Sequence, residues 1–105
     1  MKIIEVTMVR VYLTEGQAHL NALLKQLHDE CKVRGVTVFR GITGFGRSGN
    51  VHSSSLLDMS LDLPLVVEFF DEPPKAQRIL EILDTVIEPG HIVTWQARLR
   101  IDDDS

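Results

Sequence analysis

The order of two hydrophobic periods along the chain constrains its fold more than any other feature. Four segments, residues 2–13, 36–45, 61–70 and 92–101, are rich in apolar and β-branched residues and partly alternate with polar ones, which is typical of strands. Two segments, beginning near Thr14 and near Asp71, instead repeat apolar residues every three or four positions, as a helix with one buried face does. The sequence therefore predicts the order strand, helix, strand, strand, helix, strand.

Residues at the predicted helix ends support this order. Thr14 is expected to cap the first helix and Gly35 to end it. Asp71 with Pro73 suits the start of the second helix, and Pro89–Gly90 is expected to break it. The predicted buried faces are Leu20, Leu23, Leu24, Leu27 and Cys31 in the first helix, and Ala76, Ile79, Leu80, Leu83, Val86 and Ile87 in the second.

Right-handed crossovers place both helices on one face of the sheet. The predicted fold class is therefore α+β, a ferredoxin-like βαββαβ sandwich with an antiparallel four-stranded sheet and two helices on one face. Strands 2–13 and 61–70 carry apolar residues at both odd and even positions, and therefore on both faces of the sheet. A sheet with one covered face requires fewer. We expect an oligomer to bury the second face, and we expect Trp95 to lie in the core or an interface.

Size and composition indicate a single domain over residues 1–105, because 105 residues with 44% apolar content are enough for one core. The net charge is −4 and no cluster of lysine and arginine is present, so nucleic acid is not expected as a partner. Cys31 is the single cysteine and is expected in the core. Without a long apolar run at its start, the protein is expected in the cytoplasm; a short acidic tail, 102–105, closes the chain.

A glycine-rich segment, RGITGFGRSG at residues 40–49, follows the second strand. Gly44, Gly46 and Gly49 match the pattern G-x-G-x-x-G, but no helical period follows them, which excludes a dinucleotide-binding fold. Glycines still allow backbone N–H groups to approach an anion closely. The structural alternative is a strand end with a bulge and a tight turn.

The segment after these glycines, residues 46–60, is polar, rich in serine and without a period, which predicts a long loop. Such loops are uncommon in a compact domain and usually functional. Arg40, Arg47 and His52 add positive charge around it.

The run GFGRSG at 44–49, at the start of a long loop within the order βαββαβ, resembles the T-loop base of PII signal-transduction proteins. The runs TVFRGITGFG at 37–46, LPLVVE at 63–68 and DEP at 71–73 resemble more closely the PII-like (GlnB-like) family called domain of unknown function 190. This resemblance implies a homotrimer whose sheets face inward. It also implies an adenine-type nucleotide or a similar small anionic ligand in clefts between subunits.

The resemblance can be carried to individual residues. Gly44, Gly46 and Arg47 match the PII loop base, and Gly90 stands where PII proteins have a second phosphate loop. A pair of arginines in the last strand is similar to the paired arginines near the PII C-terminus. The implied nucleotide-binding residues are Arg40, Gly41, Gly44, Phe45, Gly46, Arg47, Gly49, His52, Gly90, Arg98 and Arg100.

The leading hypothesis is a regulatory binding protein that requires no cofactor and takes AMP, ADP or ATP as its ligand. The nucleotide would order loop 46–60, which then engages or releases a membrane transporter or an enzyme. The alternative is a CutA-like trimer, metal-associated or purely structural, for which His52, His91 and Asp58 are the available ligands. An enzyme ranks third, and no catalytic residues are assigned, because a flexible polar loop does not hold a base rigidly.

Overall fold

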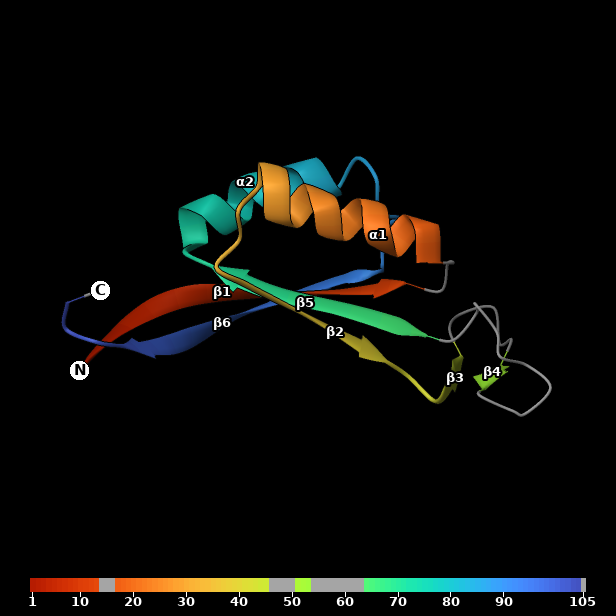
Figure 1. Cartoon of the computed structure of the whole chain (residues 1–105), viewed down its shortest axis with the longest axis horizontal. Helices are drawn as coiled ribbons and strands as arrows, with labels where there is room; N and C mark the ends of the chain where they lie inside the picture. Colours follow the sequence, from red (N-terminus) through yellow and green to blue (C-terminus); the bar gives the residue numbers. More distant parts are fainter. Residues whose placement is uncertain (14–16, 46–50, 54–63, 105) are drawn as a thin grey trace.

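The computed structural model describes residues 1–13, 17–45, 51–53 and 64–104 (Figure 1). The four strands β2 (Gly35–Arg40), β5 (Leu65–Asp71), β1 (Lys2–Leu13) and β6 (Ile92–Ile101) form one sheet in that spatial order, and every neighbouring pair is antiparallel. The remaining elements are α1 (Gln17–Lys25), the π-helical turn η1 (Gln26–Glu30), β3 (Thr43–Phe45), β4 (Val51–Ser53) and α2 (Pro73–Leu83). The predicted ferredoxin-like α+β fold is confirmed.

Both helices cover the same face of the four-stranded sheet, as the right-handed crossovers require (Figure 1). Alternate residues of the two central strands point into this layer, because side chains of a strand alternate between its faces. The core is built from Val9, Val11 and Leu13 of β1, Leu65, Val67 and Phe69 of β5, and Leu20, Leu23, Leu27, Ile79, Leu83 and Ile87 of the helical layer. Leu24, Leu80 and Cys31 pack against it while only partly buried, so Cys31 lies at the margin of the core and not inside it as predicted.

The predicted strand 36–45 is wrong as a single element. β2 ends at Arg40, and the chain then enters β3, which pairs with β4 in a separate two-stranded sheet. The Gly41 N–H donates to the Pro64 carbonyl oxygen at 2.7 Å, and Pro64 has no N–H with which to continue the ladder. Segment 46–60 is consequently not one uninterrupted loop, because β4 lies within it.

The first helix does not end at Gly35, as the sequence had predicted. Helical structure stops with η1, and Lys32 takes the left-handed backbone conformation with a φ of 51°. The Val33 N–H then donates to the Leu27 carbonyl oxygen at 3.2 Å. Gly35 instead opens β2, where an added Cβ would approach the Phe70 ring to 3.2 Å. The expected cap Thr14 lies outside the described residues.

The second helix begins near the expected place but ends early. Its N-cap is Glu72, whose N–H donates to the Asp71 carboxylate at 2.8 Å. Regular helix stops at Leu83, and a turn carries the chain onward, so Val86 is 51% exposed instead of buried. The Thr85 hydroxyl donates to the Ile82 carbonyl oxygen at 2.7 Å, which satisfies an acceptor at this helix end.

Candidate functional site

The glycine segment begins at a tight contact between the end of β2 and the start of β5. A Cβ added to Gly41 would lie 3.2 Å from the Pro64 side chain and 3.3 Å from its carbonyl oxygen. Only glycine therefore allows the 2.7 Å hydrogen bond between these two backbones without displacement. This contact sets the point at which the chain leaves the main sheet.

Beyond it, β3 and β4 form a small antiparallel ladder. Gly44 lies opposite His52, and Phe45 lies opposite Val51, so two predicted site positions are brought together through their backbones. Arg40, the last residue of β2, is exposed beside this ladder. The predicted site residues Gly46, Arg47 and Gly49 lie outside the described residues.

The turn before β6 lies at the same end of the sheet. Arg40 is opposite Leu65, which in turn is opposite Leu13 of β1. The residue before Leu13 in β1, Tyr12, donates its N–H to the His91 carbonyl oxygen at 2.9 Å. Neighbouring strands are about 4.8 Å apart, so roughly 10 Å separates β2 from β1 here. The structure thus brings the turn before β6 and residues 41–45 to the same end of the sheet (Figure 1).

Gly90 has a φ of 91°, a conformation that residues with a Cβ rarely adopt. Beside it, His91 Nδ1 lies 3.1 Å from the Tyr12 carbonyl oxygen, and His91 Nε2 lies 3.9 Å from Glu88 Oε2. A small pocket of about 130 Å³ opens here, lined by Tyr12, Leu13, His19, Val86, Ile87, Glu88 and His91. This turn therefore combines the positive φ of Gly90 with the His91 imidazole, which lies within hydrogen-bonding distance of the Tyr12 carbonyl oxygen.

Arg98 and Arg100 are not part of this arrangement within one chain. Both are exposed, and they lie opposite Glu5 and Ile3 of β1. Val11, near the glycine end, is six residues from Glu5, and a strand rises about 3.3 Å per residue. The two arginines are therefore roughly 20 Å or more from the glycine segment along the sheet.

The sheet face without helices carries a charged group that the sequence analysis missed. Arg10 donates to Glu68 Oε1 from Nε at 3.0 Å and from Nη2 at 2.6 Å, and its guanidinium carbon lies 5.3 Å from the centre of the Trp95 ring. The hydrogen bond to Glu68 raises the pKa of Arg10 above its ordinary value. The sequence did contain a signal for this pair, because an arginine and a glutamate stand among the apolar residues of the two strands.

Apolar residues surround this charged pair. The register places on this face Ile4, Val6, Met8 and Tyr12 of β1, Val66 and Phe70 of β5, Phe39 of β2, and Val93, Trp95, Ala97, Leu99 and Ile101 of β6. Trp95 was expected in the core or an interface. Its exposure of 38% leaves the interface, which stays a prediction.

Metal ligands expected from the sequence fall largely outside the described part of the chain. Within it, no three histidine, cysteine, aspartate or glutamate side chains are placed to hold a metal ion. Asp58 and the His52 side chain lie outside the described part. None of the described helices is long and apolar enough to cross a membrane.

Comparison with known proteins agrees with this fold. The profile of the family DUF190, described as "Uncharacterized ACR", matches residues 6–99. A UPF0166 protein of Aquifex aeolicus is 32% identical over 85 residues, which cover 77% of this chain and 81% of that protein.

Two solved structures are similar in fold. CPII, a nitrogen regulatory PII-like protein from Thiomonas intermedia K12 bound to ADP, AMP and bicarbonate, has a TM-score of 0.69 at 18% identity, covering 95% of this chain and 91% of that one. CutA1 from Oryza sativa has a TM-score of 0.58 at 11% identity, covering 95% and 84%. The family match over most of the chain and the PII-like architecture lead to one conclusion: this chain belongs to the DUF190 family.

Proposed function

We propose that this protein is a regulatory binding protein, and not an enzyme, whose ligand is an adenine nucleotide. The observation that carries the proposal is that Arg40, Gly41 and Gly90 lie at the same end of the sheet. Glycine-rich backbone beside a cation suits the phosphate groups of a nucleotide. The similar protein CPII is bound to ADP, AMP and bicarbonate, which supports this ligand class and suggests bicarbonate as a second, small anion.

The proposal includes a homotrimer. The apolar face without helices needs a cover, and Trp95 at 38% exposure and Val93 at 47% lie on it. Arg98 and Arg100 are too far from the glycine segment to serve it within one chain. In the trimer, we propose that a neighbouring copy supplies them, so that the nucleotide lies in a cleft between subunits.

The proposed output is a change in segment 46–60, which follows β3 in the chain and contains β4. A nucleotide at its base would favour one conformation of the segment, which then engages or releases a transporter or an enzyme. The proposal places the protein in the cytoplasm, where adenine nucleotides are abundant.

Isothermal titration calorimetry of the purified protein with AMP, ADP, ATP and cyclic AMP tests this function. We expect at least one to bind with a Kd below 1 mM, and Arg40→Ala to weaken it by about tenfold through loss of a charged contact. Arg78→Ala on the exposed side of α2 is the matched control and should leave the Kd unchanged. Bicarbonate at a fixed concentration should alter the nucleotide Kd if the two sites adjoin.

Absence of binding by all four nucleotides, with heat stabilisation by a divalent metal instead, would favour the CutA-like alternative. Release of a product from any nucleotide would show that the protein is an enzyme.

A further inference from the structure

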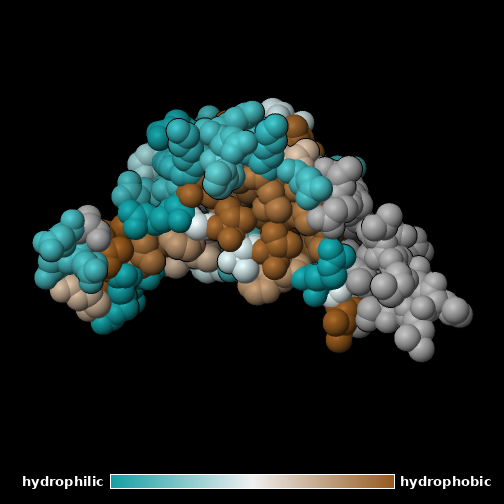
Figure 2. Space-filling view, viewed as in Figure 1, coloured by the Kyte–Doolittle hydropathy of each residue, from teal (hydrophilic) through white to brown (hydrophobic). Residues whose placement is uncertain are grey.

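The turn between α2 and β6, residues 84–91, brings negative charge to the proposed nucleotide site. Figure 2 shows that the outer side of the helical layer, from which this turn continues, is mostly hydrophilic. One pocket of about 130 Å³ and another of about 220 Å³ adjoin the turn, and Glu88 lines both. Asp84 and Gly90 also line the larger one, whereas no lysine or arginine among the described residues lines either. The turn therefore presents carboxylates beside its glycine.

The backbone of the turn keeps Glu88 close to Gly90. The His91 N–H donates to the Glu88 carbonyl oxygen at 3.3 Å, which closes the turn around the two residues between them. No atom lies within 4 Å of the position of a Cβ added to Gly90, so this part of the backbone is open to a ligand. The Glu88 side chain is itself 82% exposed. A ligand that approaches Gly90 therefore meets the Glu88 carboxylate as well.

Two histidines and one arginine of the adjoining elements are the groups available to offset this carboxylate. His91 Nε2 lies 3.9 Å from Glu88 Oε2, which is too far for a hydrogen bond, and His19 of α1 lines the same pocket. Histidine is largely uncharged at pH 8. Arg10, in the second half of β1, is already paired with Glu68. The turn is therefore negatively charged at pH 8.

Positive charge lies on the other side of the proposed site. Arg40 ends β2 and Gly41 follows it, and strand spacing puts them roughly 10 Å across the sheet from β1 and the turn. A single phosphate group beside Arg40 stays away from Glu88, but each further phosphate extends negative charge toward it. Repulsion is only partly screened within about 8 Å, the Debye length at physiological ionic strength. Charge thus changes sign across the site.

We propose that Glu88 sets the ligand preference of this site, so that a nucleoside monophosphate binds more tightly than the triphosphate. The inference rests on the proposed function, because it names the ligand class of that same site. AMP places its one phosphate at Arg40, whereas the terminal phosphate of ATP approaches the Glu88 carboxylate. A like charge that only the wrong ligand meets is an effective means of discrimination. The arginines proposed from a neighbouring copy add affinity for phosphate in general, and Glu88 decides the order.

Isothermal titration calorimetry of the full chain with AMP, ADP and ATP at pH 8 tests the proposal. Divalent metal ions are left out, because they would neutralise the phosphate groups. We expect the Kd to rise from AMP through ADP to ATP, by at least about fivefold over the series at physiological ionic strength. The difference should shrink in about 1 M salt, where the Debye length falls to about 3 Å.

Glu88→Gln should remove most of the difference between AMP and ATP, and Glu88→Lys should reverse it. Glu81→Lys makes the same change of charge at an exposed position of α2, seven residues earlier in the chain, and should retain the original order. Circular dichroism and the melting temperature confirm that each variant folds, as the exposure of Glu88 predicts.

The inference is overturned, and the proposed function stands, if ATP binds to the wild type as tightly as AMP does. It is also overturned if Glu88→Lys leaves the order unchanged, or if Glu81→Lys reverses the order equally well. If AMP, ADP, ATP and cyclic AMP all fail to bind below about 1 mM, the proposed function is wrong and the inference with it. The two failures are therefore distinguishable.

Discussion

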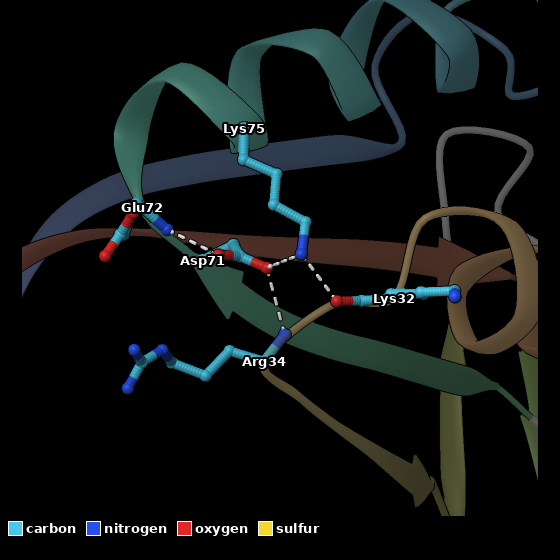
Figure 3. A network of polar contacts seen from close by, with 5 residues as sticks. All are labelled: Lys32, Arg34, Asp71, Glu72 and Lys75. Carbon is cyan, nitrogen blue, oxygen red and sulfur yellow. Dashed lines mark hydrogen bonds and ion pairs between the residues drawn. The ribbon is translucent and has the colours of Figure 1, made fainter. Parts of the chain in front are cut away.

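At the scale of single residues, Asp71 joins the start of α2 to the turn before β2, which lies 37 residues earlier in the chain. Its carboxylate holds the backbone of Arg34, the backbone of Glu72 and the ammonium group of Lys75 (Figure 3). The sequence predicted Asp71 as a helix cap, which is close to its role at the start of α2. Its contact with the turn before β2 depends on the pairing of β2 with β5, which no local pattern encodes.

Asp71→Asn is expected to lower the free energy of unfolding by about 1–3 kcal/mol, because a buried acceptor of several hydrogen bonds loses its charge. Urea unfolding followed by circular dichroism measures the change. Asp84→Asn, at the exposed end of α2, is the control and should shift stability by less than about 0.5 kcal/mol. Equal effects of the two substitutions would contradict the role assigned to Asp71.

Gly90→Ala is expected to cost about 1–2 kcal/mol, because its φ of 91° is unfavourable for a residue with a Cβ. No atom lies within 4 Å of the position of an added Cβ, so the cost is conformational and not steric. Gly90→Asn should cost less, since asparagine tolerates positive φ better. Thermal unfolding of both variants provides the comparison, and a larger loss for asparagine would refute this explanation.

At the scale of elements, the strand period predicted the bounds of the first and the last strand of the chain correctly. β1 and β6 have the predicted bounds, 2–13 and 92–101, because each is a long run of alternating or β-branched residues. The prediction for 36–45 was wrong because it took composition as evidence for one continuous strand. The division at Gly41 results from its contact with Pro64, 23 residues later in the chain.

Phe69 of β5 is fully buried between the sheet and the helical layer. Phe69→Ala is expected to destabilise the protein by about 3–5 kcal/mol, since it removes a large side chain and leaves a cavity. Ile82→Ala on α2, where the side chain is 42% exposed, should cost much less. Chemical denaturation at a fixed protein concentration separates the two, and similar midpoints would show that β5 is not central to the core.

At the scale of the whole molecule, the face without helices indicates how copies associate. Its apolar residues surround the ion pair of Arg10 and Glu68, and Trp95 lies against the Arg10 guanidinium. Apolar residues at both parities predicted an uncovered face from sequence alone. The ion pair at its centre became evident only when the register of β1 with β5 placed the two residues opposite each other.

Trp95→Lys is expected to lower the sedimentation mass from that of an oligomer to that of a monomer, because it adds a positive charge beside Arg10 on the apolar face. Thr94→Lys, one residue earlier and pointing to the other face, is the matched control and should leave the mass unchanged. If wild type already sediments as a monomer, the proposed trimer is wrong.

By itself, the sequence determined the order of elements and the faces of the helices that become buried. It also showed that the glycine segment resembles the loop base of PII proteins. These properties follow from residues close together in the chain, where hydrophobic period and turn chemistry act directly. Tertiary structure decided that Gly41 and Gly90 share one end of the sheet while Arg98 and Arg100 lie at the other. It also decided that the start of β2 lines a groove together with the first helix. The reason is that strand register joins residues far apart in sequence, and only the packed sheet sets that register.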